Sequence, residues 1–307
     1  MAVSRRTLLI LAIALSAVLL WRWSSFSNHA TLVESVTQQK TQQQKTFDIV
    51  LAYYSEAPDV VRQQIQYLKS LPALAPLAPR VILYTKGLGI DSTHEEQEAL
   101  RRNLDVDILR VLPNVGREAD TYLAHISEHY DELAGHTLFG QGDMEYLEWA
   151  GGRLQNHFND RLGFMSLHHL PAYTMCYCDG CFVPGGSPDP VYGFKRIPQL
   201  YSMFNERICP PEGLLLTYKG QFVVSRQRIT RNSREKFAWL RSILTNMTHW
   251  VHDDPTDERD LLLGFAKHDP LNPLFGHTLE RSWPFLFGCN DLDLLYTCGD
   301  ERCACYD

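Results

Sequence analysis

Residues 49–54 read Ile-Val-Leu-Ala-Tyr-Tyr, a continuous apolar run that is typical of a strand buried on both faces. Residues 58–71 follow it with Val61, Ile65 and Leu68 at helical spacing. The same alternation continues downstream, with predicted strands at 81–84, 106–112 and 137–139 and predicted helices at 94–103 and 118–133. Strands that alternate with helices predict parallel βαβ units and therefore a doubly wound, mostly parallel sheet.

The second half of the chain is less regular. We predict further strands at 163–167 and 220–225, and a helix to about residue 246 that opens with a capping box of Asn232 and Glu235. Residues 172–211 are rich in Cys, Gly and Pro, which predicts a loop insertion where disulfides substitute for a missing core. We therefore expect one α/β domain over residues 46–307.

The pattern at the N-terminus predicts a targeting signal rather than an ordinary buried helix. Arg5 and Arg6 precede an uncharged run, residues 7–21, that would span roughly 22 Å as a helix. The hydrocarbon core is about 30 Å thick, so the short run favours a cleaved signal and a secreted protein. Trp21 and Trp23 suit a membrane interface and favour a type II anchor. We predict a cytoplasmic tail at 1–6, a signal anchor in the membrane at 7–23, and a flexible stem at 24–45.

Cysteine usage agrees with an ER, Golgi or extracellular compartment. The chain has eight cysteines, and in an oxidising lumen disulfides are expected, with a pairing that the sequence leaves open. Zinc binding at the clusters 176–181 and 303–305 is the alternative.

Asn246-Met247-Thr248 is an N-glycosylation sequon, which predicts a glycoprotein. A net charge of −7 without a basic stripe gives no support for a nucleic-acid partner.

Residues 112–118, Leu-Pro-Asn-Val-Gly-Arg-Glu, link the third predicted strand to its helix, where parallel sheets bind ligands. Gly116 would let the backbone approach a ligand, and Arg117 offers a fork for phosphate or carboxylate. Glu118 would orient Arg117 or hold a sugar hydroxyl, and Asn114 would also contact the substrate. The alternative is a tight turn in which Arg117 pairs with a nearby acid.

The fourth predicted strand ends in Phe-Gly-Gln-Gly-Asp-Met-Glu, residues 139–145. Asp143 and Glu145 would hold Mn²⁺ or Mg²⁺ across the diphosphate of a nucleotide sugar, because oxygen ligands suit these cations. Gln141 would contact the substrate. An acidic N-cap of the next helix is the alternative interpretation.

Residues 276–288 combine polar and aromatic side chains in one short segment. Glu280 would act as general base toward an acceptor hydroxyl, Trp283 as a stacking platform for a sugar, and His277 as a metal ligand. The alternative is an amphipathic helix with core aromatics, in which Glu280 pairs with Arg281 or another base.

The run 114–119, Asn-Val-Gly-Arg-Glu-Ala, followed by Tyr122-Leu123 and Tyr130-Asp131, resembles the domain-of-unknown-function family numbered three-four-three-one. Later landmarks in the same order are 163–167, 221–225 and Glu280-x-x-Trp283 leading to Phe287-Gly288. The similarity covers about residues 47–288. The Asn-x-Gly-Arg-acid run is also similar to one in bacterial rhamnan-synthesis proteins, which are glycosyltransferase-like. The resemblance implies a glycosyltransferase-A-like fold, sugar transfer and a short N-terminal anchor.

Together these features predict a lumenal, metal-dependent enzyme that moves a sugar from a nucleotide-sugar donor to a glycan or protein acceptor. The nucleotide would lie over Tyr53, Tyr54, Ser55 and residues 114–118, with Asp143 and Glu280 as catalytic groups. A non-catalytic protein that binds glycans or a partner is the main alternative. A hydrolase that uses Asp143 or Glu145 with Glu280 is a second alternative.

Overall fold

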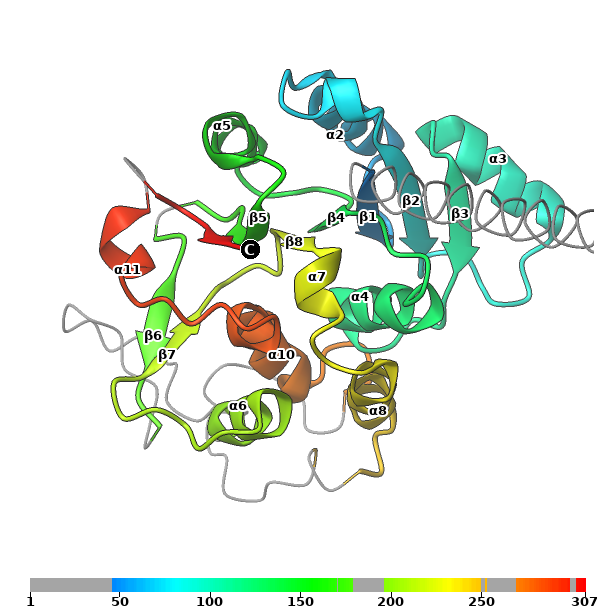
Figure 1. The fold of residues 1–307 in the computed structure, drawn as a ribbon. Helices are drawn as coiled ribbons and strands as arrows, with labels where there is room; N and C mark the ends of the chain where they lie inside the picture. Colours follow the sequence, from blue (N-terminus) through cyan, green and yellow to red (C-terminus); the bar gives the residue numbers. More distant parts are fainter. Residues whose placement is uncertain (1–45, 170, 179–195, 250–251, 253–268, 299–301) are drawn as a thin grey trace, which may run out of the picture. The chain divides into compact units, whose positions relative to one another are not determined.

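The computed structural model describes residues 46–169, 171–178, 196–249, 252, 269–298 and 302–307, and within them seven strands form one sheet (Figure 1). The strands are β1 (Phe47–Tyr53), β2 (Arg80–Thr85), β3 (Ile108–Val111), β4 (His136–Gln141), β5 (Leu162–Ser166), β8 (Phe222–Ser225) and β9 (Cys305–Tyr306). Their order across the sheet is β3-β2-β1-β4-β8-β5-β9. Two short strands, β6 (Thr174–Cys176) and β7 (Leu214–Leu216), pair separately as an antiparallel ribbon.

The sheet is mixed but mostly parallel, as the alternating pattern predicted. Strand β1 pairs in parallel with β2 and β4, so Val50 lies opposite both Ile82 and Phe139. Strand β8 is antiparallel to both β4 and β5, and β9 is antiparallel to β5. Among the described strands of this sheet, only β8 and β9 run against the common direction. An antiparallel pair needs no crossover helix, which explains why the helix–strand alternation fades in the second half.

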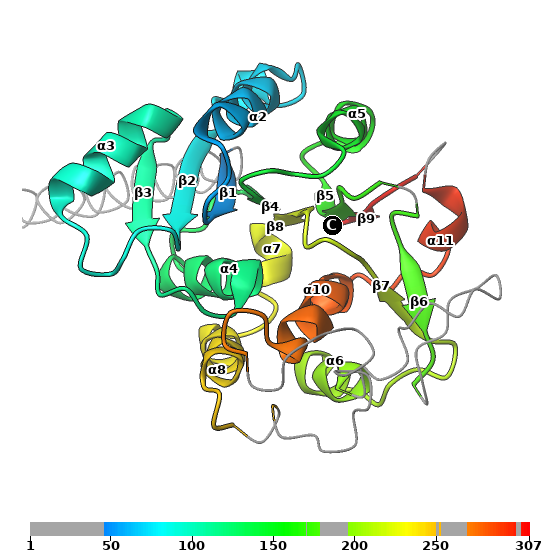
Figure 2. The ribbon, with the colours of Figure 1, turned by 180° about the vertical axis from the view of Figure 1, so that it is seen from behind.

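Helices cover both faces of the sheet (Figure 2). One face carries α2 (Pro58–Ser70), α3 (His94–Leu104) and α5 (Leu147–His157), and the other carries α4 (Arg117–Glu128), α8 (Arg234–Thr245) and α10 (Leu274–Leu286). Helix α6 (Ile197–Asn205) packs on α10. The short helices are η1 (Ala75–Leu77), α7 (Arg226–Ile229) and α11 (Leu294–Thr297). Because strand side chains alternate, Ile49 and Leu51 of β1 join one core and Val50 and Ala52 the other.

Two expectations for the second half were wrong in detail. Helix α8 begins at Arg234 with Ser233 as its N-cap, and the Asn232 side chain instead donates to the Leu286 carbonyl oxygen at 3.1 Å. That buried hydrogen bond removes Asn232 from the predicted capping box. The insertion at 172–211 is joined by the Cys178–Cys209 disulfide but does not lack a core, because Leu200 and other residues of α6 are buried in the main core.

Disulfides are present, as predicted for an oxidising compartment. Within the described parts of the chain the bonds are Cys178–Cys209, Cys289–Cys305 and Cys298–Cys303. These cysteines are not thiolate ligands, which argues against the zinc alternative at both clusters. The bonds fit a secretory or extracellular location. Asn246 of the sequon is exposed at the end of α8, and its side-chain oxygen accepts a 2.8 Å hydrogen bond from Thr248.

The predicted tail, anchor and stem, residues 1–45, lie outside the described residues, as do Cys181 and part of the insertion. Among the helices that are described, none is both long enough and apolar enough to cross a bilayer. The described residues from Thr46 to Asp307 form one compact unit.

A buried histidine makes the stability of this unit sensitive to acid. The His125 ring on α4 is 1% exposed, and burial lowers its pKa to about 3, with smaller contributions from His129 and Arg80. Below about pH 6.5 the unfolded chain binds a proton that the folded chain does not. Stability therefore falls as pH decreases from about 6.5 toward 3, and between pH 7 and pH 5 this histidine alone should remove about 2 kcal/mol from the free energy of unfolding.

Urea unfolding at pH 7 and pH 5 measures that loss. We expect the difference between the two pH values to shrink by about 2 kcal/mol in His125→Leu. The exposed His94, at the start of α3, is the matched control, and His94→Leu should leave the difference unchanged. An equal pH dependence in wild type and His125→Leu would show that His125 does not titrate as described.

Candidate functional site

The strand order locates where a ligand would bind. The chain adds β2 and β3 on one side of β1 and then returns to place β4 on the other side. Such a reversal is a topological switch point, and ligands of open α/β sheets bind beyond the carboxyl ends of the strands there. The residues that follow β1 and β4 meet at this point, because a Cβ on Gly142 would lie 3.2 Å from Glu56 Cδ and 3.3 Å from the Tyr53 ring.

Tyr53, Tyr54 and Ser55 lie at this edge. Tyr53 is 9% exposed and Tyr54 is 55% exposed. The Glu56 carboxylate accepts hydrogen bonds from the backbone N–H groups of Tyr54 (2.7 Å) and Ser55 (3.0 Å), so it holds the turn after β1 in place. Burial, followed by the charge of Glu56, raises the pKa of Tyr53.

The loop that carries Asn114, Gly116 and Arg117 is anchored by Lys86. The Lys86 ammonium group, just after β2, donates to the carbonyl oxygens of Val115 and, at 2.7 Å, of Arg117. It also pairs with Asp120 at 2.9 Å, and both side chains are almost completely buried. Burial lowers the pKa of Lys86, against the opposing effect of Asp120.

Gly116 has a packing role in this loop. Its φ of +64° lies in the left-handed region, and a Cβ there would come within 3.1 Å of Leu244 on α8. Its N–H donates to the Pro270 carbonyl oxygen at 2.9 Å. Gly116 therefore brings the backbone close to α8, while Asn114 beside it is half-buried.

Seven polar residues form one continuous series of contacts at the carboxyl edge of the sheet, through their side chains and the Lys219 backbone N–H, and we call this series the polar network. Its members, in order of contact, are Glu118, Arg117, Asn272, His277, Glu280, Lys219 and Glu145. Five of these were singled out from the sequence, and they come from the start of α4, the loop after β4 and the first half of α10. The structure thus brings together groups that lie far apart in the chain.

Arg117 and Asn272 form one half of the polar network. The Arg117 guanidinium group lies 3.4 Å from the Glu118 carboxylate and donates to the Asn272 side-chain oxygen at 3.0 Å. The same oxygen lies 3.1 Å from His277 Nε2. The Arg117 side chain is 45% exposed, whereas that of Glu118 is only 11% exposed, so Arg117 is the more accessible charged group of this half.

Glu280 is the centre of the other half. Its carboxylate lies 3.3 Å from His277 Nδ1 and 3.5 Å from the Arg281 guanidinium group, and it accepts a 2.6 Å hydrogen bond from the Lys219 backbone N–H. Burial alone would raise the pKa of Glu280. The hydrogen bond to His277, the charge of Arg281 and the Lys219 N–H outweigh it and lower that pKa to about 2.

Glu118 has the opposite electrostatic environment. Burial raises its pKa, Arg117 opposes that effect, and the negative charge of Glu280 adds to it. A Cβ on Gly220 would lie 3.5 Å from Glu118 Cγ and 3.6 Å from the Tyr122 ring. Both carboxylates therefore flank the turn at residues 219–220, and the site holds one carboxylate that stays ionised beside one that takes up a proton more readily.

Tyr122 adds a buried hydroxyl to this environment. Its side chain is 0% exposed, and its oxygen has no hydrogen-bond partner among the described residues. Burial, with the charges of Glu118 and Glu280, raises the pKa of Tyr122 well above its ordinary value. The hydroxyl therefore stays protonated and can act only as a neutral hydrogen-bonding group.

The loop after β4 is held by Gln64 of α2. The Gln64 amide donates to the Gln141 carbonyl oxygen at 2.8 Å and accepts from the Met144 N–H at 2.7 Å. The Gln141 side chain in turn donates to the Lys219 carbonyl oxygen and contacts Gln221 at 3.0 Å. Gln141 is thus a link between the loop after β4 and the turn at residues 219–220.

The three predicted metal ligands are not gathered at one point. Asp143 and Glu145 are exposed on the loop after β4, and Glu145 pairs with the Lys219 ammonium group at 2.9 Å. His277 instead contacts Glu280 and Asn272. Within the described parts of the chain no group of three His, Cys, Asp or Glu side chains could hold a metal ion.

Trp283 does not form an exposed sugar platform. Its side chain is 0% exposed, and its ring stacks on Phe287 at a centroid distance of 5.9 Å. It also packs against Phe222 and Tyr122. The reason is the register of α10, which turns this residue toward the core between the helix and the sheet. The amphipathic alternative therefore describes Trp283, and the pairing of Glu280 with Arg281 that it predicted is also present, at 3.5 Å. Glu280 is in addition a member of the polar network.

Lys219, Asn272 and Gln221 were missed by the sequence analysis. Lys219 and Gly220 both have positive φ values, 69° and 59°, in the turn that leads into β8. A lysine before a glycine ahead of an apolar strand was the available signal, but nothing local connects that turn with Glu280. Asn272 lies before α10 and belongs to no motif.

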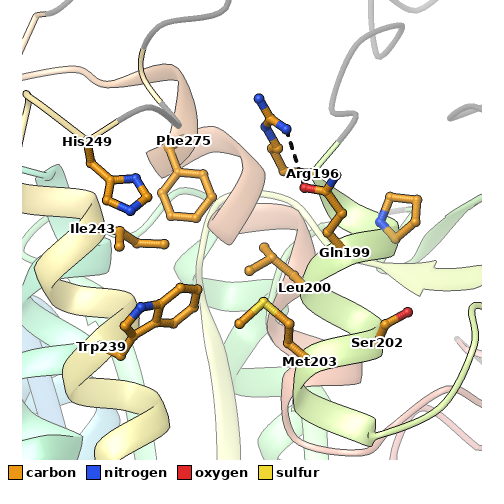
Figure 3. Close-up of a pocket in the computed structure, with 10 residues that line it drawn as sticks. Arg196, Gln199, Leu200, Ser202, Met203, Trp239, Ile243, His249 and Phe275 are labelled. Atoms are coloured by element: carbon orange, nitrogen blue, oxygen red, sulfur yellow. Dashed lines mark hydrogen bonds between the residues drawn. The ribbon is translucent and has the colours of Figure 1, made fainter.

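A pocket of about 570 Å³ lies between α6, α8 and the start of α10 (Figure 3). It is lined by Arg196, Pro198, Gln199, Leu200, Ser202, Met203, Trp239, Ile243, His249 and Phe275. Its walls are mostly apolar, and it shares no residue with the polar network. None of the site residues predicted from the sequence lines it.

No model of a known protein family matches this chain, and no curated protein is significantly similar to it. The resemblance to the family numbered three-four-three-one therefore stays a prediction, and function has to be inferred from the site itself.

Proposed function

We propose that this protein is a lumenal glycosyltransferase-like enzyme that transfers a sugar from a nucleotide-sugar donor to a glycan or protein acceptor. The observation that carries the proposal is the polar network, which lies at the switch point of the sheet and combines exposed cationic groups with a pair of carboxylates. The expected glycosyltransferase-A-like fold is part of the same proposal, supported by the strand order and by helices on both faces.

The donor would bind over the carboxyl ends of β1 and β4. Arg117 is half-exposed and already oriented by Asn272, so it offers a bidentate contact to a phosphate. Lys219, whose side chain is 44% exposed, brings a second positive charge to the site. In a nucleotide-sugar donor the diphosphate is the leaving group, and these two cations would stabilise the charge that develops on it.

The two carboxylates would divide the remaining roles. A general base works best when its pKa is near the operating pH. Glu280, whose pKa is lowered to about 2, is a weak base, and its part in the proposal is to hold His277, Arg281 and the Lys219 N–H in place. Glu118, whose pKa is raised, is the better group to accept the proton of an acceptor hydroxyl. We therefore transfer the catalytic role that the sequence suggested for Glu280 to Glu118.

A divalent cation at Asp143 and Glu145 remains a prediction. The two carboxylates are close in sequence and exposed, but Glu145 is engaged by Lys219 and His277 lies with Glu280. The side chains that the structure describes thus supply at most a partial ligand set. No step above depends on a metal ion. Donor binding should be measured with and without Mn²⁺ for this reason.

Arg117→Ala tests the donor site. In a thermal-shift screen of the full chain in mild detergent, nucleoside diphosphates and nucleotide sugars, with and without Mn²⁺, should include at least one that raises the melting temperature. We expect Arg117→Ala to weaken binding of that nucleotide at least about tenfold, because one bidentate phosphate contact is lost. Arg102→Ala, an exposed arginine on α3, is the matched control and should bind as wild type does.

A well-folded wild type that responds to no nucleotide would contradict the proposal and favour the non-catalytic binding protein. Equal nucleotide binding by wild type and Arg117→Ala would move the donor site away from the polar network. Sugar release from a glycan without any nucleotide would instead favour the hydrolase.

A further inference from the structure

Exposed aromatic rings gather next to the polar network, on the loop between β4 and α5, in α5 and on the loop after β5. Tyr146 is 53% exposed and Trp149 is 49% exposed. The His169 ring stacks on Tyr146 at a centroid distance of 4.5 Å and meets Trp149 edge-on at 4.7 Å. His168 approaches Tyr146 at 6.2 Å. We call Tyr146, Trp149 and His169 the aromatic platform.

Tyr146 adopts a costly backbone conformation to take part in this cluster. Its φ of +55° lies in the left-handed region, which is uncommon for a bulky residue. The loop that precedes Tyr146 is fixed in place, because Gln64 bonds the Gln141 carbonyl oxygen and the Met144 N–H, and the Met144 side chain is buried. Strain that the surrounding structure maintains is characteristic of functional sites.

The platform is continuous with the polar network. Glu145, which pairs with Lys219, directly precedes Tyr146. His168 lies close enough to this pair that its pKa, lowered mainly by burial, is also lowered by Lys219 and raised by Glu145. The exposed rings therefore border the charged groups of the candidate donor site.

This combination of groups matches one class of ligand. A pyranose ring has an apolar face of C–H bonds and a rim of hydroxyls, so it is bound by exposed aromatic faces with hydrogen-bonding side chains beside them. A lipid would not require the histidine, carboxylate and ammonium groups at the rim. We propose that the aromatic platform binds a pyranose unit of a glycan. As the acceptor subsite of the transfer described above, it rests on the proposed function, whereas glycan binding itself does not.

Glycan binding to the full chain tests the platform. The probes are cellotetraose, mannotetraose and chitotetraose, observed by saturation-transfer NMR and titrated for affinity. We expect at least one of them to bind wild type and the affinity to fall at least about tenfold in Trp149→Ala and in Tyr146→Gly. Trp239→Ala is the matched control, because Trp239 is 39% exposed on α8 and outside the platform.

Tyr146→Gly also separates binding from folding. Glycine adopts the left-handed conformation without strain, so this variant should fold at least as stably as an alanine variant at the same position. Loss of glycan binding in a folded Tyr146→Gly protein supports the platform. Failure of all three glycans to bind wild type, or undiminished binding in both platform variants, would overturn it.

Nucleotide binding distinguishes the two proposals. The platform variants should keep the nucleotide response of wild type. Glycan binding without any nucleotide response would leave the platform standing and remove the transferase. A nucleotide response without glycan binding would support the transferase and overturn the platform.

Discussion

Asp120→Ala should lower the free energy of unfolding by about 3–5 kcal/mol, the usual result of removing one partner from a buried ion pair. The Asp120 carboxylate is 1% exposed and pairs with Lys86 at 2.9 Å and with Arg241 at 2.8 Å. Without it, the buried ammonium group of Lys86 keeps its desolvation cost and loses the charge that compensates it. Urea unfolding at pH 7 measures the loss.

An exposed ion pair provides the control. Asp131 pairs with Arg234 on the surface, where the side chains are 77% and 43% exposed. Asp131→Ala should cost less than about 1 kcal/mol because water screens the interaction. The double variant Lys86→Met with Asp120→Leu should recover part of the loss, since the unpaired ammonium group is gone. A loss below about 1 kcal/mol in Asp120→Ala would show that the pair is not buried as described.

The same pair connects stability with the candidate site. Lys86 holds the carbonyl oxygens of Val115 and Arg117, so its displacement would release the loop that presents Arg117. Asp120→Ala should therefore also weaken nucleotide binding, although Asp120 touches no ligand in the proposal. Arg117→Ala, by contrast, should weaken binding with little change in stability because its side chain is half-exposed.

Glu118→Gln should reduce turnover by about 10²–10⁴-fold, the usual contribution of a general base. The substitution keeps the shape of the side chain and its place between Arg117 and Gly220, and it removes the group that accepts the proton. The KM for the donor should change only a few-fold, because Arg117 and Lys219 remain. Release of nucleoside diphosphate in the presence of an acceptor measures turnover.

The pH profile separates a base from a positioning group. As the pH falls, Glu118 becomes protonated and the turnover rate decreases. Because the pKa of Glu118 is raised, this decrease should occur at a higher pH than the pKa of an ordinary glutamate would give. Glu280, whose pKa is lowered to about 2, stays ionised and should contribute no limb above about pH 4. Glu98→Gln is the matched control and should keep wild-type turnover. Glu98 lies on helix α3, which packs beside the edge strand β3, and it is not a member of the polar network. More than about a tenth of wild-type turnover in Glu118→Gln would remove Glu118 as the base.

Local patterns determined the first half of the fold. The apolar runs at 49–54 and 81–84 could be predicted as strands because a strand buried on both faces has almost no polar residue. The helix from Pro58 could be predicted from its apolar spacing and from proline at its first position. The start of α8 after Ser233 was missed, because the Asn232 side chain is used in a tertiary hydrogen bond to Leu286.

The chemistry at the start of α4 and in α10 was also visible in the sequence, since Arg117, Glu118 and Glu280 are reactive types in short polar runs. The point at which these residues meet in the folded chain could not be predicted from the sequence. No local signal shows that Lys219 would present its backbone N–H to Glu280, or that Asn272 would join Arg117 to His277.

The amino-acid sequence by itself determined the α/β class, the strands and helices of the first half, and the presence of disulfides, which fit an oxidising compartment. Each of these depends on side-chain periodicity or on residue type. Only the tertiary structure decided which groups act together. Strand β8 runs antiparallel beside β4 and brings the turn at residues 219–220 to the switch point, and α10 packs with Trp283 inward and Glu280 toward that turn. Lys219 and Glu280 are more than sixty positions apart, and the energy of their contact depends on burial and charge in the folded chain.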